Sequence, residues 1–518
     1  MGDVGTTRRR RGGRDATAAA RETGGAVRQA PFGPPRHAVA PLELIGEASL
    51  DRIHEAALTI LEEIGMDFLS EEARAIAVEA GARPGPEPER LRFPRALVEA
   101  MVAKAPQRFT IRAPDPRHDM HLGQGYTYWG AVSSAPHMHD VAGGRRPGTQ
   151  ADFRRLLRLG QSLNVLSFFG GYPVEPQDLP PATRHLDCIF DFLTLSDKVF
   201  HPYCLGRQRI VDALELLQIG RGLSRAELEA GPVCYTVVNS SSPLRYDKPM
   251  LEGMIEMARA NQCVCLTPFT LAGAMAPITL AGAIAQQNAE TLAGIVFAQM
   301  VRPGAPVIYG AYTSNVDMRT GSPAMGTPEY VKATLISGQL ARRYGIPYRS
   351  SGGNAANMPD AQAIWETGFA LWGARLAQAD IVMHAAGWLE GGLSASPEKM
   401  VIDAEVLQGL DAVLSEVVVD DETLALDAVR EVGPAGHFFG AAHTMTRYTT
   451  AFYEPLLSDW SNFGAWQAAG SRDALARAEA MADVLLDGFS PPALDAARVE
   501  AMAAYVARRK AEGGALDA

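Results

Sequence analysis

The sequence predicts an α/β protein built around a TIM (β/α)8 barrel, with an N-terminal helical lead-in and a C-terminal helical extension. Eight short apolar segments, each followed by a helical segment, fill about 290 residues, which is the pattern of such a barrel. Strand–helix–strand units of this kind form parallel strands joined by right-handed crossovers. A doubly wound open sheet is the alternative, but it usually has fewer strands.

The clearest such unit spans residues 266–312. An apolar strand ends at Pro268, and a turn rich in proline and glycine leads to a long helix of small residues that starts near Thr279. A second apolar strand follows. The helix carries Glu290, which we expect to make a structural or subunit contact rather than do chemistry, because the helix should pack outside the barrel.

The chain before the barrel divides into two parts. Residues 1–41 are expected to be a disordered basic tail. The arginines at 8–11 are followed by no apolar segment of the kind found in secretory signals, so we do not expect a secretory signal there. Residues 42–125 predict a helical lead-in, with an apolar stripe at helical spacing in 49–64 and an N-cap serine at Ser70. Segments 108–113 and 118–123 predict a hairpin.

The barrel itself is assigned to residues 126–416. The expected strands are Tyr126–Ala131, Val165–Gly170, Lys198–Leu205, Val233–Asn239, Cys263–Pro268, Pro306–Tyr312, Pro347–Ser351 and Asp380–His384. The expected helices are 149–163, 182–195, 207–221, 248–261, 279–302, 327–344, 359–378 and 398–415. Residues 417–518 change pattern and predict a C-terminal extension that contains two alanine-rich helices, at about 472–486 and 492–510.

Composition excludes several classes of protein. The formal net charge of −11 over 518 residues argues against nucleic acid as a partner, because phosphate binding needs a basic surface. The five cysteines lie in apolar segments, which favours reduced thiols and a cytoplasmic protein. No apolar run approaches the roughly 20 residues that span a bilayer, so no membrane contact is expected.

In a barrel, function lies at the carboxyl ends of the strands. The side chains expected to bind substrate there are rich in aromatic rings: Tyr128, Trp129, Asn239, Tyr309, Tyr312, Arg349, His384 and Trp388. Aromatic faces suit a quaternary ammonium ion, which has no N–H to donate but is attracted to ring faces. Arg349 suits a substrate carboxylate, or equally a salt bridge to a neighbouring loop. Tyr309 and Tyr312 should face opposite sides of their strand, and the sequence does not decide which faces inward.

Other chemistries find less support. A Schiff-base enzyme needs a desolvated lysine inside the barrel, and Lys198 only opens its strand. Cys263 and Cys265 share one face of a strand, where core packing is commoner than a zinc site. The Gly352-Gly353 loop fits a tight turn as well as a phosphate site. We therefore expect no metal bound by this chain.

Several long blocks resemble the trimethylamine methyltransferase family. They lie between residues 45 and 510 and read AMAPITLAGAIAQQNAETLAGIVFAQMVRPGAPVIYG, HDVAGGRRPGTQADFRRLLRL, SNVDMRTGSPAMGTPE, NMPDAQAIWE, HAAGWLEGGLSASPEKMVID and GHFFGAAHT. The resemblance implies a TIM barrel that transfers a methyl group from a methylated amine to the cobalt of a partner corrinoid protein. Founding members of the family carry pyrrolysine. This chain has only standard residues and so resembles the non-pyrrolysine branch, some of whose members demethylate quaternary amines such as glycine betaine.

The expected activity is therefore methyl transfer from a glycine betaine-like quaternary amine to the Co(I) of a cognate corrinoid protein, with the cobalamin carried by that partner. A quaternary nitrogen leaves as a neutral amine, so orientation and exclusion of water should suffice without acid–base residues. The sequence leaves alternatives open: trimethylamine or another methylated amine as substrate, a non-catalytic betaine-binding barrel, or a metal- or phosphate-dependent lyase. We also expect a homo-oligomer.

Overall fold

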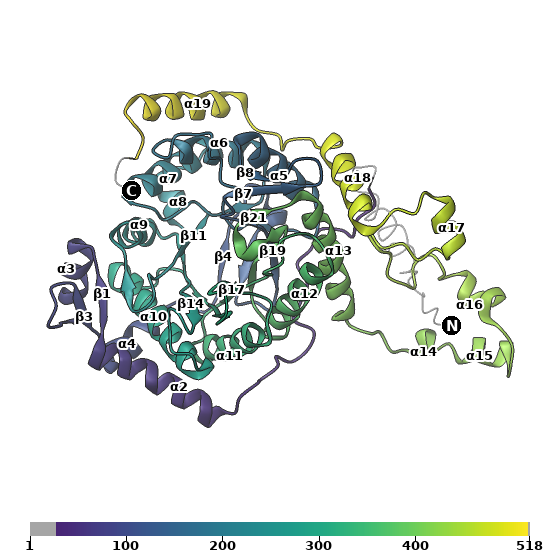
Figure 1. Cartoon of the computed structure of the whole chain (residues 1–518), viewed down its shortest axis with the longest axis horizontal. Coiled ribbons are helices and arrows are strands. Elements are labelled where there is room, and N and C mark those ends of the chain that lie inside the picture. Colours follow the sequence, from purple (N-terminus) through teal and green to yellow (C-terminus); the bar gives the residue numbers. More distant parts are fainter. Residues whose placement is uncertain (1–26, 516–518) are drawn as a thin grey trace, which may run out of the picture.

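The computed structural model describes residues 27–515, and the eight predicted strands form one parallel sheet at its centre (Figure 1). Their order in the sheet is β10-β9-β6-β19-β18-β15-β13-β11. In chain order they are β6 (Tyr128–Ala131), β9 (Phe168–Phe169), β10 (Val199–Phe200), β11 (Tyr235–Val238), β13 (Cys263–Leu266), β15 (Val307–Gly310), β18 (Tyr348–Ser351) and β19 (Ile381–Ala386). The predicted barrel is confirmed.

Hydrogen bonds from side chains close the barrel between the first and last strands of the sheet, which are not joined by a strand ladder. Strands β10 and β11 stand at the two ends of the strand order. The ring of His201 spans this seam: its Nδ1 donates to the carbonyl of Gly170 (2.9 Å), and its Nε2 accepts from the Val237 N–H (3.0 Å). The Thr236 hydroxyl donates across the same seam to the Pro202 carbonyl (2.7 Å).

The eight predicted helices also form, each within a few residues of its expected range. They are α5 (Gln150–Ser162), α6 (Arg184–Leu195), α7 (Arg207–Arg221), α9 (Lys248–Arg259), α10 (Leu280–Val301), α11 (Pro328–Tyr344), α12 (Ala361–Leu376) and α13 (Pro397–Val413). A short α8 (Arg225–Glu229) precedes β11. Local sequence sets the starts: Thr149 and Asp152 form a capping box at α5, and Thr327 caps α11 before a proline in its first turn.

The lower half of the barrel interior is an apolar core that a hairpin closes. The hairpin strands β4 (Phe109–Ile111) and β5 (Met120–Leu122) pair antiparallel as predicted, with the 3-10 turn η2 (Pro116–His118) between them. Ile111, Met120 and Leu122 pack against side chains at the amino ends of the barrel strands, such as Phe168 and Ile308. This plug leaves the carboxyl ends of the strands as the place for a site.

The remaining lead-in elements cover α10 on the outside of the barrel (Figure 1). They are α2 (Glu47–Thr59), η1 (Ile60–Ile64), β1 (Met66–Phe68), α3 (Glu71–Glu79), β2 (Arg83–Pro84), β3 (Arg90–Arg92) and α4 (Arg95–Val102). Strand β1 also pairs with β12 (Arg245–Tyr246), which lies in the loop after β11. The lead-in is thus tied to the barrel by both a helix face and a strand pair.

The expected tail needs a correction. Residues 1–26, with the arginine cluster, lie outside the described residues, so the tail remains a prediction there. Residues 35–37, however, run beside the start of the first barrel strand: Thr127 N–H donates to the Pro35 carbonyl (3.0 Å), and His37 N–H donates to the Gly125 carbonyl (2.9 Å). A proline-rich segment without periodicity gave no sign of this single-strand attachment.

Two small sheets over the strand ends were not predicted. One, in the order β20-β21-β7-β8, joins β7 (His137–Asp140) and β8 (Gly144–Pro147) to β20 (Trp388–Leu389) and β21 (Ser394–Ala395), which flank the 3-10 turn η3 (Glu390–Gly392). The other contains β14 (Phe269–Ala272), β16 (Tyr312–Val316) and β17 (Pro323–Ala324). Their strands are only two to five residues long, so the sequence pattern of these segments is that of loops.

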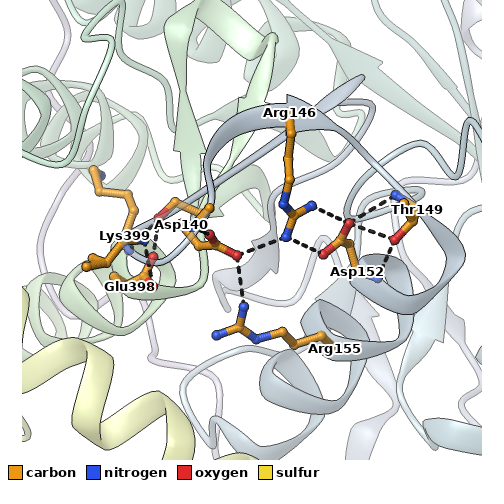
Figure 2. Close-up of polar contacts among 10 residues, drawn as sticks. Asp140, Arg146, Thr149, Asp152, Arg155, Glu398 and Lys399 are labelled. Atoms are coloured by element: carbon orange, nitrogen blue, oxygen red, sulfur yellow. Dashed lines mark hydrogen bonds and ion pairs between the residues drawn. The ribbon is translucent and has the colours of Figure 1, made fainter.

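An ion-pair cluster anchors the β7–β8 hairpin to α5 (Figure 2). The guanidinium of Arg146 lies between Asp140 (3.0 Å) and Asp152 (2.6 Å), and Arg155 reaches Asp140 from the helix (3.0 Å). Both carboxylates are almost fully buried, so the cluster fixes the hairpin rather than binding solvent ions. The cluster accounts for Arg146 and Arg155, whereas Arg145 pairs with Glu390 and Arg154 with Asp191.

The C-terminal extension crosses the outside of the barrel (Figure 1). It comprises α14 (Asp421–Leu424), α15 (Leu426–Val432), η4 (Phe438–Gly440), α16 (Ala442–Met445), α17 (Phe463–Ala468), α18 (Ala474–Asp487) and α19 (Ala496–Ala511). The two alanine-rich helices match α18, which packs on α13, and α19, which packs on α6 and α7. Within residues 27–515, no helix combines the length and apolarity that crossing a bilayer requires.

Candidate active site

A cavity of about 540 Å³ opens at the carboxyl ends of the barrel strands, beneath the small sheet that contains β20 and β21. Its lining is Ser134, Pro136, Gly170, Glu175, His201, Tyr203, Cys204, Leu205, Val237, Asn239, Met250, Thr267, Phe269, Tyr312, Arg349, Met383, His384, Trp388, Gly391, Gly392 and Leu393. A larger cavity of about 840 Å³ lies elsewhere, between residues 30–39 and the end of α13 on the outside of the barrel. The strand-end cavity is where barrel chemistry is expected.

Five of the eight candidate residues line this cavity: Asn239, Tyr312, Arg349, His384 and Trp388. The other three lie elsewhere. Tyr128 faces the interior but sits at the amino end of β6, where its hydroxyl accepts from the His121 N–H (2.8 Å). Trp129 faces outward, and its indole N–H donates to Asp411 on α13 (3.0 Å). Tyr309 also faces outward, bonded to Gln287 and Asn288 on α10 (3.0 and 2.9 Å).

Strand geometry explains these three placements. Side chains alternate between the two faces of a strand and advance about 3.3 Å per residue. Trp129 and Tyr309 therefore point to the helices, whereas Tyr312, three positions after Tyr309, points inward. Tyr128 points inward but is the first residue of β6, so it reaches the hairpin plug and not the strand-end cavity.

Aromatic rings form one wall of the cavity. Strands β14 and β16 place Phe269 directly opposite Tyr312, with ring centres 5.3 Å apart. The Trp388 indole meets Tyr312 edge-on at 6.4 Å and lies 4.1 Å from the His384 ring. The Trp388 N–H and the Tyr312 hydroxyl are buried and have no hydrogen-bond partner among the described residues. This wall offers ring faces to a ligand and few hydrogen bonds.

Arg349 adds a positive charge beside that wall. It lies on β18, is 3% exposed, and holds its guanidinium 5.4 Å from the centre of the Tyr312 ring. Its own contacts are weak for a cation: the sulfur of Met383 (3.2 Å) and the carbonyl of Ala311 (3.3 Å). No carboxylate in residues 27–515 pairs with it. A buried guanidinium without a counter-charge is costly, and an anion placed beside it would reduce that cost.

His384 enters the cavity through a distortion of its strand. Its backbone is left-handed (φ 55°), and the pairing of β19 with β6 shifts register between Val382 and Ala386. The bulge lets the adjacent residues Met383 and His384 both line the cavity, where Nδ1 of His384 lies 3.1 Å from the Ser133 hydroxyl. Burial, together with the charge of Arg349, keeps its pKa well below the ordinary value, so the ring is neutral.

His201 and Tyr203 also line the cavity and were not among the residues expected to bind substrate. Burial lowers the pKa of His201 to about 4, and both of its ring nitrogens bond backbone groups: the Gly170 carbonyl after β9 and the Val237 N–H across the seam. The Tyr203 hydroxyl lies 2.8 Å from the Ser134 hydroxyl and accepts from the Tyr172 N–H (3.1 Å). Both side chains are thus occupied in holding the rim.

Glu290 makes a structural contact, which is one of the two roles expected for it: it holds the loop that carries Asn239. This carboxylate is fully buried on α10. It accepts from the hydroxyls of Ser240 and Ser242, the latter at 2.5 Å, and from the Leu244 N–H at 2.9 Å. The Asn239 amide in turn donates to the Thr267 carbonyl (2.9 Å). The sequence block around Glu290, which resembles the trimethylamine methyltransferase family, therefore holds the rim of the cavity in place but does not line the cavity.

Phe269, Tyr203 and Met383 are among the cavity residues that were not expected to bind substrate. Phe269 and Tyr203 stood at the expected strand ends, and their aromatic character was the available signal. Met383 gave no signal, because a regular strand would place it and His384 on opposite faces. No cluster of three histidine, cysteine, aspartate or glutamate residues within 27–515 is arranged to hold a metal ion.

Comparison with known proteins finds a family model and relatives that match nearly the whole chain. The family model for trimethylamine methyltransferase (MTTB) matches residues 10–514. A glycine betaine methyltransferase of Desulfitobacterium hafniense (strain Y51) is 35% identical, over 91% of this chain and 98% of its own length. A trimethylamine methyltransferase, MttB, of D. hafniense (strain DSM 10664 / DCB-2) is 30% identical, over 86% and 90%.

Among solved structures, the alignment with the monomethylamine methyltransferase MtmB of Methanosarcina barkeri covers 87% of this chain and 96% of the MtmB chain, at 10% identity and a TM-score of 0.45. The family model and both sequence relatives span nearly the whole chain. The chain therefore belongs to the trimethylamine methyltransferase family and is a methyltransferase.

Proposed function

We propose that this methyltransferase takes a methyl group from a quaternary amine that also bears a carboxylate, glycine betaine or a close analogue, and passes it to the Co(I) of a cognate corrinoid protein. The observation that carries the proposal is a buried, unpaired guanidinium, Arg349, beside an aromatic wall in one cavity. The 35% identity to a glycine betaine methyltransferase supports the same substrate.

The two halves of the cavity suit the two ends of a betaine. Arg349 can donate two parallel N–H bonds to a carboxylate, which would supply the counter-charge it lacks. Phe269, Tyr312 and Trp388 present rings to the trimethylammonium group, which has no N–H and is attracted to ring faces. Trimethylamine or choline would leave Arg349 unpaired, and binding of either should be weaker for that reason.

The neutral histidines fit a cationic substrate. A protonated His384 or His201 would repel the ammonium, and burial holds the pKa of each below its ordinary value. Neither ring is needed as a proton donor, because the quaternary nitrogen leaves as a neutral tertiary amine. The residues of this chain therefore bind, orient and shield the methyl group.

The aromatic wall should be incomplete around the ammonium. The positive charge on nitrogen disappears during transfer, so a cage that bound the cation on every side would stabilise the substrate more than the transition state. The corrinoid of the partner protein supplies the Co(I) nucleophile as the second substrate. Tyr312 and Trp388 on one side, with the rest of the mouth open, meet this requirement.

We propose further that the protein acts in the cytoplasm and forms a homo-oligomer. All five cysteines are buried free thiols, which suits a reducing compartment. The segment between α13 and α18 exposes large apolar side chains, such as Phe439 (84% exposed) and Phe452 (80%), which a subunit contact would cover. Analytical ultracentrifugation tests the oligomer, and a monomer at micromolar concentration would contradict it.

The function is tested by methylation of cob(I)alamin, followed by its visible spectrum. Purified protein should methylate the cofactor with glycine betaine and release dimethylglycine, at a rate well above that with trimethylamine or choline. Transfer from trimethylamine alone would contradict the proposed substrate. Tight betaine binding without any transfer, either to free cob(I)alamin or to a corrinoid protein, would make the chain a binding protein instead.

A further inference from the structure

A buried polar network lies behind the aromatic wall, and none of its four side chains lines the cavity. We infer that Asn354, Thr367, Lys399 and Asp403 form a positioning network, which fixes the Trp388 indole at the angle the substrate requires. This inference deepens the proposed function and rests on it. It assigns a purpose to four residues that do not line the cavity and act through Trp388, which does.

The Trp388 segment needs such support because its backbone departs from a regular strand. His384 has a left-handed backbone, and Gly387 has φ of 92°. A Cβ at Gly387 would lie 3.0 Å from a Val132 methyl, so only glycine fits this turn. The ladder that holds β19 therefore ends before Trp388, which pairs only with Ala395 in the two-residue ladder of β20 and β21.

Two side-chain hydrogen bonds add to this pairing and hold the two ends of the Gly387–Trp388 unit from the core side. Asp403 Oδ2, on α13, accepts from the Gly387 N–H (2.8 Å). The Asn354 side-chain amide donates to the Trp388 carbonyl (2.7 Å). Because one bond precedes the indole and the other follows it, together they set the direction in which the side chain leaves the backbone.

Lys399 and Thr367 join these two bonds into one unit. The Lys399 ammonium forms an ion pair with Asp403 and donates to the Thr367 hydroxyl (3.0 Å). That hydroxyl also accepts from the Asn354 amide (3.1 Å). Each of the four side chains is no more than 2% exposed. A shift at Asp403 would therefore be transmitted to Asn354.

The indole ring itself makes no hydrogen bond to the described residues. Its N–H lacks a partner among the described residues, so no bond of its own fixes the ring. On its outer side, Gly392 approaches so closely that a Cβ there would lie 2.5 Å from the ring. A buried ion pair adds little net stability compared with apolar residues of the same shape. Precise placement of Trp388 is the benefit that this arrangement offers.

The first test needs no ligand. In protein labelled with 5-fluorotryptophan, Trp388 should give one narrow 19F resonance, assigned by its loss in Trp388→Leu. Thr367→Val, the mildest break in the network, and Asn354→Ala should broaden, shift or split that resonance. Lys198→Met is the matched control, because this buried lysine bonds the carbonyls of Gly160, Gln161 and Leu163 far from the cavity. An unchanged Trp388 resonance in Thr367→Val and Asn354→Ala would overturn the inference.

The second test is a double-mutant cycle on glycine betaine binding, measured by calorimetry. Thr367→Val and Asn354→Ala should each raise Kd at least fivefold in the wild-type background and have no further effect in Trp388→Leu. Equal losses in both backgrounds would mean a merely structural contribution and would overturn the inference. Absence of betaine binding by the wild type would instead contradict the proposed function, and the 19F result would still decide the positioning.

Discussion

The guanidinium carbon of Arg349 lies 5.4 Å from the centre of the Tyr312 ring. Tyr312 also meets Phe269 and Trp388, so one ring links the cationic part of the cavity to its aromatic wall. This link allows a small dipolar ligand to touch Arg349 and the aromatic rings at once. It also makes the two ends of the site separable by mutation.

Replacing Arg349 should separate carboxylate recognition from ammonium recognition. Arg349→Gln is expected to weaken glycine betaine binding by about 2 kcal/mol, or roughly thirtyfold in Kd, because a charge-assisted bond is lost. Tetramethylammonium, which has no carboxylate, should bind the variant as well as the wild type. Arg375→Gln, another buried arginine but outside this cavity, serves as control. Equal losses for both ligands would rule out a carboxylate contact.

Substitution of Tyr312 should change substrate binding, whereas substitution of Tyr309 should change stability. Tyr312→Leu is expected to weaken binding of glycine betaine by about 1–2 kcal/mol, through loss of the ring face. Tyr312→Phe should bind normally, because the hydroxyl has no partner among the described residues. Tyr309→Phe should leave binding unchanged but lower the free energy of unfolding by about 1 kcal/mol, since its bonds to Gln287 and Asn288 are lost. Weaker betaine binding by Tyr309→Phe would contradict the placement.

Glu290→Gln should destabilise the fold. An amide in place of the carboxylate would turn one acceptor into a donor that faces the Ser240 and Ser242 hydroxyls or the Leu244 N–H. We expect the free energy of unfolding in urea to fall by about 2 kcal/mol, as is usual for a buried polar mismatch. A stability equal to that of the wild type would show that the loop is held by other contacts.

Acid should destabilise the protein through His201. Its pKa is about 4 in the folded chain, whereas the unfolded chain takes up the proton near the ordinary value of 6.5. Between these values the unfolded state binds more protons, so stability falls with falling pH, by up to about 3 kcal/mol for this group. His201→Gln, which keeps a donor and an acceptor at the seam, should show a shallower decline between pH 6.5 and 4. Parallel curves for variant and wild type would contradict the assignment.

The parts of the fold set by repeated local patterns were predictable from sequence. Eight apolar segments, each followed by an amphipathic or small-residue helix, fixed the barrel, and caps such as Thr149 and Thr327 marked helix starts. The small sheet that contains β20 and β21 was not predicted, because a strand of two residues is too short to show alternation of apolar and polar side chains.

The site was predictable only as far as side-chain type and strand position determine direction. The placement of Arg349 follows from its position on a strand, whereas the sequence left open whether Tyr309 or Tyr312 faces inward. Tyr128 was misplaced because the start of β6, two residues later than expected, sets it beside the plug. His384 lies in the cavity beside Met383 only because of a bulge with a left-handed residue, and single-sequence patterns do not reveal such a distortion.

The central claim is tested most directly by one rate comparison on the purified protein: methylation of cob(I)alamin with glycine betaine against trimethylamine, in the wild type and in Arg349→Gln. We predict that the wild type prefers glycine betaine and that the substitution removes this preference by slowing the betaine reaction at least tenfold. A wild type that methylates cobalamin only from trimethylamine, or an Arg349→Gln variant with an unchanged betaine rate, would contradict the account.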